Sequence, residues 1–374
     1  MSELARSARP AIFDIQPYVP GKPIEEVQRE LGISDVIKLA SNENPLGPSP
    51  RALEALREWL PKAHLYPDGG ATRLKERIAL KVGVKPENVI VGNGSDELIK
   101  LVAEAFLNPG DEVVMADPSF SEYAFAALLL GARVKKVALL GERHDLKAMA
   151  DAIGPRTKLV FICNPNNPTG TIVSAAEVRE FMAAVPDEVL VVFDQAYEEY
   201  VTDPAYGGGL PYVLAGRRAV VLRTFSKIYG LAGLRVGYGI ASPELLALVE
   251  RAREPFNVNQ AAQVAAAAAL DDEEFVARSR ELCARERERL ATALAGRGFP
   301  VDPSQANFLF VDVGVDSAAL FRRMLPLGVI IRSGDIFRRP TSIRVTVGTP
   351  EQNDRFLAAL DTARRALLEE GERA

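Results

Sequence analysis

Short apolar runs alternate with stretches of helical periodicity through the middle of the chain. The runs predict strands over residues 89–91, 112–116, 159–163, 189–193, 219–222 and 235–240. A capping box, in which Ser174 precedes Glu177 by three positions, predicts the start of one intervening helix. Strands that alternate with helices are typical of a mostly parallel sheet covered by helices. We therefore expect a large domain of the α/β class.

The C-terminal third has a different pattern. A long charged helix over about 272–295 precedes strands at 307–312 and 342–346, and a last helix follows. This order predicts a smaller α+β domain. The first 40 residues are rich in turn signals, which favours an arm. We expect an N-terminal arm at 1–41 that joins the small domain, a large domain at 42–258 and a small C-terminal domain at 259–374.

Composition narrows the functional classes. The chain has 374 residues, 48% of them hydrophobic, and a net charge of −5, which argues against a nucleic-acid surface and a polybasic membrane anchor. Cys163 and Cys283 are too few for a disulfide framework and indicate a reducing compartment. We expect no signal peptide, and no apolar run reaches the roughly 18 residues of a membrane span.

Histidine is scarce, since His64 and His144 are the only two in the chain. Neither a multi-histidine zinc site nor Ser-His-Asp chemistry is expected, and no metal site is predicted. We expect both histidines to be exposed on the surface. If the chain is an enzyme, another side chain must therefore transfer protons.

Polar and aromatic side chains follow the predicted strands, where ligands of open parallel sheets bind. They are Ser95, Asp96, Phe120, Asn167, Asp194, Tyr197 and Lys227. Taken singly, each has a structural explanation, such as a capped turn, a tight turn, a core ring or an exposed lysine. Their positions after successive strands favour one shared ligand.

Pyridoxal phosphate would use this set of side chains. It needs a lysine for a Schiff base, which Lys227 offers, and a carboxylate such as Asp194 to keep its ring nitrogen protonated. Residues 92–96 open a helix whose free N–H groups can hold a phosphate. Arg235 can contact the same phosphate through planar, directional donors. Lys227, once displaced by substrate, is also the natural base for a proton shift between Cα and C4′.

Eight motifs, in chain order, carry a family resemblance: SNENPLGP, YPDGG, GNGSDE, DPSFSEY, NPNNPTG, FDQAY, TFSKIYGLAGLRVGYG and IRVTVGT. The set resembles the fold-type-I pyridoxal-phosphate aminotransferases, and the histidinol-phosphate aminotransferase group in particular, over about residues 17–360. The resemblance implies a mostly parallel seven-stranded sheet sandwiched by helices, pyridoxal 5′-phosphate as cofactor, and a cytoplasmic homodimer with shared active sites. It also implies ping-pong transfer of an amino group between L-histidinol phosphate and 2-oxoglutarate, giving imidazole-acetol phosphate and glutamate.

The resemblance also implies residue roles. Lys227 would be the Schiff-base lysine, Asp194 would face the ring nitrogen, and Tyr197 would bond the ring hydroxyl; these are the catalytic residues. The other implied cofactor contacts are Ser95, Asp96, Phe120, Asn167, Thr224, Ser226, Arg235 and, from the neighbouring subunit, Tyr66. The implied substrate contacts are Tyr18, Asn44, Asn167, Phe256, Arg332 and Arg344.

Two residues depart from the pattern of the family, and several alternatives stay open. Gln195 replaces a common glutamate, and Phe120 replaces a frequent tyrosine, so only ring stacking remains there.

The alternative to histidinol-phosphate transamination is an aromatic amino-acid aminotransferase, followed by a pyridoxal-phosphate-dependent decarboxylase. A cofactor-sensing regulator would need a DNA-binding domain, for which 40 residues are too few. For Arg332, an ion pair with Asp335 is the alternative to a substrate contact.

Overall fold

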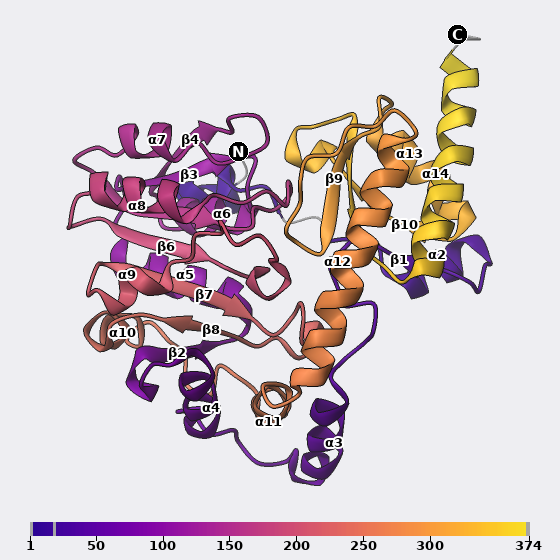
Figure 1. Ribbon diagram of the computed structural model, residues 1–374. Helices are drawn as coiled ribbons and strands as arrows, with labels where there is room; N and C mark the ends of the chain where they lie inside the picture. The colour runs from indigo at the N-terminus through magenta and orange to yellow at the C-terminus, as the bar shows by residue number, and fades with distance from the viewer. Residues whose placement is uncertain (1–2, 18–19, 372–374) are drawn as a thin grey trace.

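The computed structural model describes residues 3–17 and 20–371. A large α/β unit and a smaller α+β unit lie side by side, and the long helix α12 (Glu273–Ala295) runs along the junction between them (Figure 1). The predicted α/β architecture is thus present.

Seven strands form the sheet of the large unit, in the order β2-β8-β7-β6-β5-β3-β4. They are β2 (Val89–Gly92), β3 (Glu112–Asp117), β4 (Arg133–Ala138), β5 (Thr157–Cys163), β6 (Leu190–Asp194), β7 (Ala219–Thr224) and β8 (Gly237–Ile240). Strands β3 to β7 are parallel to one another, and β8 is antiparallel to both β7 and β2. The mostly parallel seven-stranded sheet is confirmed.

Strand β4 is the one strand of this sheet that the apolar pattern did not predict. It lies at the sheet edge, where its side chains are exposed or half-buried, and it contains Lys135 and Lys136. An edge strand buries less surface than a central one, so polar residues interrupt the apolar run by which the other strands are recognised.

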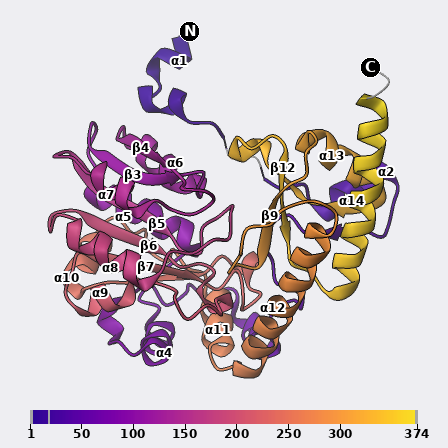
Figure 2. The same ribbon diagram turned by 45° about the horizontal axis from the view of Figure 1, so that its top comes forward.

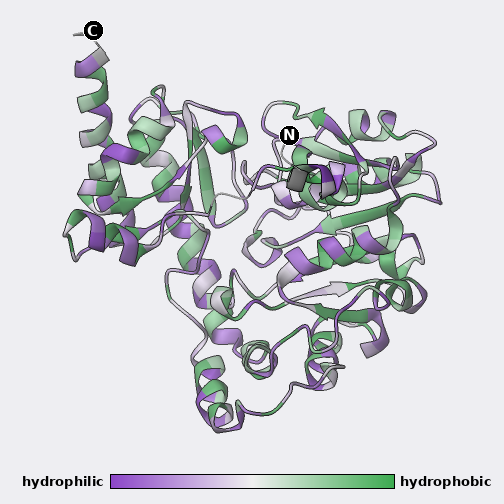
Figure 3. Cartoon of the chain, turned by 180° about the vertical axis from the view of Figure 1, so that it is seen from behind, coloured by the Kyte–Doolittle hydropathy of each residue, from purple (hydrophilic) through white to green (hydrophobic). Residues whose placement is uncertain are grey.

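Helices cover both faces of this sheet. They are α3 (Pro50–Trp59), α4 (Thr72–Val82), α5 (Gly94–Phe106), α6 (Ser121–Leu129), α7 (Leu146–Asp151), α8 (Ala175–Ala184), α9 (Leu210–Leu214), α10 (Pro243–Val249) and α11 (Gln260–Ala269). Successive residues of a strand enter opposite apolar clusters: Phe193 packs in one, and Val192 in the other. Because both faces of the sheet are covered, its central strands are mostly apolar (Figure 3). Helix α8 begins with the predicted capping box.

The small unit contains the antiparallel sheet β11-β12-β9 and a parallel pair, β1-β10. Its elements are α2 (Ile24–Leu31), β1 (Ile37–Lys38), β9 (Phe308–Asp312), α13 (Ser317–Met324), β10 (Val329–Ile330), β11 (Arg332–Ser333), β12 (Ser342–Thr346) and α14 (Pro350–Gly371). Figure 2 shows these elements gathered away from the large sheet. Part of the predicted arm therefore folds with the small unit: Val27 of α2 is fully buried against Ala40 and Ile330.

The start of the described chain lies elsewhere. Helix α1 (Glu3–Ser7) is followed by the turn Pro10–Asp14, which packs on α6 of the large unit. Nη2 of Arg9 donates a hydrogen bond to the carbonyl of Leu129 at 2.7 Å.

The domain border at residue 258 stays a prediction, and the packing favours a later position. Ala262 and Ala266 of α11 belong to the same apolar cluster as the large sheet. Along α12, Cys283 still packs in that cluster, whereas Leu290 and Leu294 pack in the small unit. We propose that the border lies within α12.

Candidate active site

Three parallel strands bring the predicted residues to one edge of the sheet. Cys163 is the register partner of Asp194, and Asp194 is the register partner of Leu222. The loops after β5, β6 and β7 therefore leave the sheet side by side. These loops contain Asn167, Tyr197 and Lys227, respectively.

Lys227 is held inside this edge. Its Nζ donates to the carbonyl of Ser41 at 3.3 Å and lies 5.6 Å from the centroid of the Tyr197 ring. Burial lowers the pKa of Lys227 to about 8, and the positive charges of Arg344 and Arg235 add to this effect. A lysine with a lowered pKa has a larger neutral fraction near neutral pH, which is the form that attacks a carbonyl carbon.

Asp194 ends β6 and is only 3% exposed. Its Oδ2 accepts a hydrogen bond from Oη of Tyr123 at 2.7 Å, and its Oδ1 accepts one from the N–H of Ala196 at 3.1 Å. Burial raises the pKa of Asp194 to about 6, and these two hydrogen bonds oppose the rise. A cationic N–H in front of this carboxylate would keep it ionised, as a protonated pyridine ring would.

Tyr123 is a functional residue that the sequence analysis missed. It is fully buried in α6, and its ring stacks on Phe161 with centroids 4.6 Å apart. The available signal was its place in the DPSFSEY motif, three residues after Phe120. Phe120 itself is half-buried and meets the Tyr123 ring edge-on at 5.7 Å.

An anion site forms where α5 begins. The first-turn N–H groups of Ser95 and Asp96 have no acceptor within a helix, and the helix dipole favours a negative ligand there. Gly94 precedes them with φ +79°, and a Cβ at Gly94 would lie 2.6 Å from Nη2 of Arg235. Glycine therefore permits both the backbone turn and the close approach of the guanidinium.

The loop after β7 completes the anion site. Nη2 of Arg235 lies 3.0 Å from Oδ2 of Asp96, and its Nη1 donates to Oγ of Ser226 at 3.3 Å. The N–H of Ser226 donates in turn to Oγ1 of Thr224 at 3.1 Å. Backbone amides, hydroxyls and a guanidinium suit a phosphate dianion. Together with Lys227 and the buried carboxylate, this donor set fits pyridoxal phosphate.

Asn167 and Tyr197 face the same region from the large unit. Both side chains are buried. Oδ1 of Asn167 accepts a hydrogen bond from Nη1 of Arg344 at 2.5 Å, which leaves its Nδ2 to donate elsewhere. Oη of Tyr197 accepts a hydrogen bond from Nδ2 of Asn42 at 3.1 Å. Asn42 was also missed, although it belongs to the SNENP motif.

Two arginines of the small unit lie opposite each other. Arg332 of β11 and Arg344 of β12 are register partners, and they are 8% and 7% exposed. The Arg344 guanidinium lies between the rings of Phe308 and Phe337, at 5.4 and 5.5 Å from their centroids. Like charges directly opposite each other are unfavourable on a sheet, so this pair suits an anionic ligand. The contact of Arg332 with substrate and its ion pair with Asp335 both remain predictions.

Residues 34–360 match the sequence profile of aminotransferase class I and II. The chain belongs to this family. It is 59% identical over 353 residues to histidinol-phosphate aminotransferase of Moorella thermoacetica, which covers 94% of this chain and 92% of that protein. Its identity to histidinol-phosphate aminotransferase 2 of Carboxydothermus hydrogenoformans is 50% over 353 residues, or 94% and 98% of the two chains.

A solved structure agrees with this assignment. Histidinol-phosphate aminotransferase from Sinorhizobium meliloti, crystallised in complex with pyridoxal-5′-phosphate, matches with a TM-score of 0.89 and 29% identity. The match covers 96% of this chain and 98% of that one. The fold-type-I architecture expected for this aminotransferase is thereby confirmed.

Asn44 is held by hydrogen bonds within its own subunit. Its Nδ2 donates to the carbonyl of Ile228 at 2.8 Å and to Oγ of Ser279 at 2.9 Å, and its Oδ1 accepts the N–H of Leu46 at 3.0 Å. These bonds anchor the SNENP segment to the Lys227 loop and to α12. The structure thus shows an anchoring role for Asn44, and its predicted contact with substrate remains a prediction.

Tyr66 and Phe256 form an aromatic pair at the surface of the subunit. Their rings stack with centroids 4.9 Å apart, and the residues are 84% and 47% exposed. Their predicted contacts with a neighbouring subunit remain predictions. Tyr18, predicted to contact substrate, lies outside the described residues.

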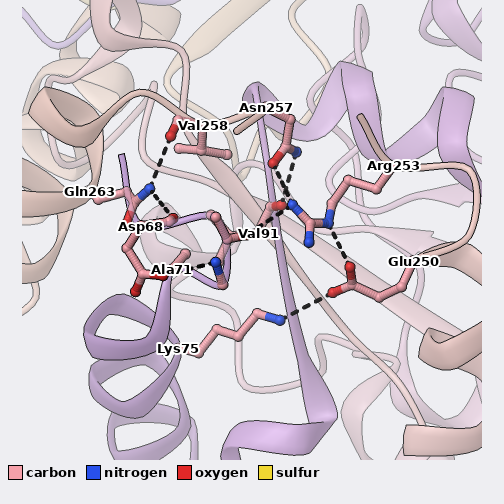
Figure 4. A pocket seen from close by; sticks show the side chains of 11 residues that line it. Asp68, Ala71, Lys75, Val91, Glu250, Arg253, Asn257, Val258 and Gln263 are labelled. Carbon is pink, nitrogen blue, oxygen red and sulfur yellow. Dashed lines mark hydrogen bonds and ion pairs between the residues drawn. The ribbon is translucent and has the colours of Figure 1, made fainter. Parts of the chain in front are cut away.

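A polar network supports the two turns that present this aromatic pair (Figure 4). Nη1 of Arg253 donates to the carbonyl of Gly69 at 3.0 Å and to Oδ1 of Asn257 at 2.9 Å. Nε2 of Gln263 donates to the carbonyls of Asp68 and Val258, both at 2.9 Å. The turns at 68–70 and 253–258 are thus tied to each other by hydrogen bonds.

The expectation for the histidines was half right. His64 is exposed, whereas His144 is 5% exposed, with Nε2 3.1 Å from Oδ1 of Asn166. The prediction for His144 was wrong because its polar partner comes from the loop after β5, which sequence spacing does not reveal. Burial lowers the pKa of His144 to about 4, so the ring is neutral at neutral pH.

Among residues 3–17 and 20–371, no cluster of histidine, cysteine or carboxylate side chains could hold a metal ion. Nor is any helix in this part of the chain both long and apolar enough to cross a bilayer.

Proposed function

We propose that this aminotransferase interconverts L-histidinol phosphate and imidazole-acetol phosphate, with glutamate and 2-oxoglutarate as the second amino donor and acceptor pair. The observation that supports this substrate is the buried, directly opposed pair Arg332 and Arg344. One arginine suffices for the carboxylate of an amino acid, whereas a phosphate dianion has acceptor sites for two. The names of the two bacterial relatives point to the same substrate.

The cofactor of this aminotransferase is pyridoxal 5′-phosphate, which supplies a carbonyl that condenses with amines and a ring that accepts electrons. Lys227 would hold the cofactor through its amine, and its Nζ, when free, would be the base for the proton shift between Cα and C4′. Asp194 would hold the proton on the ring nitrogen, and Tyr197 would donate a hydrogen bond to the ring oxygen.

The other contacts orient the cofactor. The amides of Ser95 and Asp96, the hydroxyls of Thr224 and Ser226, and Arg235 would bind the phosphate. Phe120 would stack on the ring, and Nδ2 of Asn167 would donate to the ring oxygen together with Tyr197. These contacts would orient the ring so that its nitrogen faces Asp194.

We also propose a cytoplasmic homodimer in which Tyr66 and Phe256 reach the partner subunit's site. An exposed tyrosine stacked on a half-exposed phenylalanine, on turns tied together by hydrogen bonds, supports a role outside the subunit. Cys163 and Cys283 are both free and buried, which agrees with a reducing compartment.

Half-reaction rates of the holoenzyme test the substrate. We expect reaction with histidinol phosphate to exceed reaction with phenylalanine, measured by the loss of the absorbance band of the lysine-linked cofactor. A preference for phenylalanine would instead assign the protein as an aromatic amino-acid aminotransferase. Release of CO₂ from a phosphorylated amino acid would assign a decarboxylase.

A further inference from the structure

Asn42 connects the two units beside the predicted cofactor ring. It is 2% exposed, and its backbone has φ +57°. Its carbonyl accepts a hydrogen bond from Nδ2 of Asn307 at 3.0 Å, and its N–H donates to Oγ1 of Thr346 at 2.9 Å. Both partners belong to the small unit, whereas its side-chain amide reaches Tyr197 of the large unit.

The hydrogen bonds determine which end of the Asn42 amide faces Tyr197. Oγ1 of Thr346 accepts the backbone N–H of Asn42 and donates its own proton to Oδ1 of Asn42 at 3.1 Å. This leaves Nδ2, which can only donate, to face Oη of Tyr197 at 3.1 Å. The phenol oxygen is therefore an acceptor in this contact, and its own proton is left for a different acceptor.

We propose that Asn42 is a positioning residue for the transamination reaction: it holds the phenol of Tyr197 as an acceptor, so that the phenol proton points to the ring oxygen of bound pyridoxal phosphate. This inference rests on the proposed role of Tyr197 as a donor to that oxygen. Asn42 itself contacts neither substrate nor cofactor in this scheme.

The backbone of Asn42 restricts which residues could replace it. A φ of +57° lies in the left-handed region, which glycine occupies without strain and asparagine more readily than most other residues. Glycine at this position would keep the backbone but lose the amide. Asparagine combines the backbone conformation with a side-chain donor, so an Asn42→Gly variant isolates the contribution of the amide.

Several titratable groups also face Tyr197, and all remain in the Asn42 variants. Nζ of Lys227 lies 5.6 Å from the Tyr197 ring centroid. Burial disfavours the ionised phenol, as do Cys163 and Asp194, whereas Arg344 favours it. A change in the titration of the cofactor in Asn42→Gly thus reports the hydrogen bond and not a changed neighbouring charge.

The test is an absorbance titration of the holoenzyme, which gives the pKa of the nitrogen that links Lys227 to the cofactor. A donor to the ring oxygen stabilises the anion that forms when this nitrogen loses its proton, so a weaker donor raises that pKa. In Asn42→Gly, loss of one neutral hydrogen bond should raise it by about half a unit to one unit. Asn42→Asp should raise it by about one to two units, because the new carboxylate withdraws the phenol proton from the ring.

A double-variant cycle separates this role from a purely structural one. If Asn42 acts through the phenol, adding Asn42→Gly to Tyr197→Phe should shift the titration no further. An equal shift with and without the phenol would overturn the proposal, as would a lower Tm with an unchanged titration. Thr346→Val removes the hydroxyl that orients the Asn42 amide, so it should also raise the pKa of the nitrogen that links Lys227 to the cofactor. This variant replaces Asn42→Gly in the test if Asn42→Gly does not fold.

The same cycle distinguishes failure of this inference from failure of the proposed function. An unchanged titration in Tyr197→Phe alone would refute the donor role of Tyr197 and, with it, the role of Asn42. A shift in Tyr197→Phe without one in Asn42→Gly or Thr346→Val would refute only the role of Asn42.

Discussion

Removing the hydroxyl of Tyr123 should weaken cofactor binding in a pH-dependent way. In Tyr123→Phe the ring stays stacked on Phe161, so the packing of this fully buried side chain is preserved. Oδ2 of Asp194, a residue that is 3% exposed, loses a hydrogen bond of 2.7 Å. A hydrogen bond to a charged group contributes about 1.5–3 kcal/mol.

The pH dependence of cofactor affinity in Tyr123→Phe follows from the titration of Asp194. Its pKa is about 6, and loss of the Tyr123 hydrogen bond should raise it by roughly one to two units. Below the raised pKa, Asp194 of the cofactor-free variant is protonated, so cofactor binding must also ionise this carboxyl, and the free energy of that ionisation weakens binding. Above the raised pKa, Asp194 is ionised in both the cofactor-free and the cofactor-bound variant, so binding involves no such cost. Because the wild-type carboxyl is itself half protonated at pH 6, we expect affinity to fall about five- to fiftyfold at that pH and the deficit to close toward pH 9.

The assay is a titration of cofactor-free protein with pyridoxal phosphate at several pH values. Tyr212→Phe is the matched control, because Tyr212 also stacks on a phenylalanine, Phe193, but on the opposite face of the sheet from Tyr123. Affinities of Tyr123→Phe within twofold of wild type at pH 6 would refute the reasoning. A deficit of equal size at every pH would show a packing defect instead.

Four further predictions follow from the site. Asp194→Asn should raise the free energy of unfolding of the cofactor-free protein by up to about 3 kcal/mol above pH 6, because a carboxyl with a raised pKa opposes folding where it is ionised. Chemical denaturation should show that this gain vanishes below pH 4, and the turnover of the holoenzyme should fall at least tenfold. Borohydride should attach the cofactor to Lys227, and peptide mapping that finds the label on another lysine would contradict the assignment. Lys227→Ala should still bind the cofactor but lose turnover by orders of magnitude. Arg332→Ala should lose about ten- to a hundredfold in kcat/KM with histidinol phosphate and less with phenylalanine, and equal losses would remove the case for a phosphate site. Tyr66→Phe should weaken cofactor binding about tenfold while the protein stays dimeric in sedimentation, and a fully active monomer would disprove the shared site.

Much of the fold could be predicted because its signals are local. The central strands are buried on both faces, so they are continuous apolar runs, and their order along the chain determines which loops lead to the ligand edge. Lys227 and Asp194 could be assigned because each directly follows such a run within a specific motif. The glycine turn before Ser95 is local too, since its geometry depends on the backbone of neighbouring residues.

Other features depend on contacts between residues far apart in the chain. His144 is buried because Asn166 offers a polar partner, and Tyr123 reaches Asp194 only across the packed sheet. Arg332 and Arg344 become opposed only when β11 and β12 pair in one register. No periodicity within a single segment encodes such a partner.

The SNENP segment shows most clearly which features a local motif reveals and which depend on contacts between distant residues. The motif alone indicates that this segment belongs to the active-site region, because it stands in a specific order with the other motifs that resemble those of the family. Contacts between distant residues show that Asn44 anchors the segment while Asn42 meets Tyr197. Thr346, 304 residues away, orients the Asn42 amide, whereas Ile228 and Ser279 use that of Asn44, and no pattern within the motif could distinguish the two.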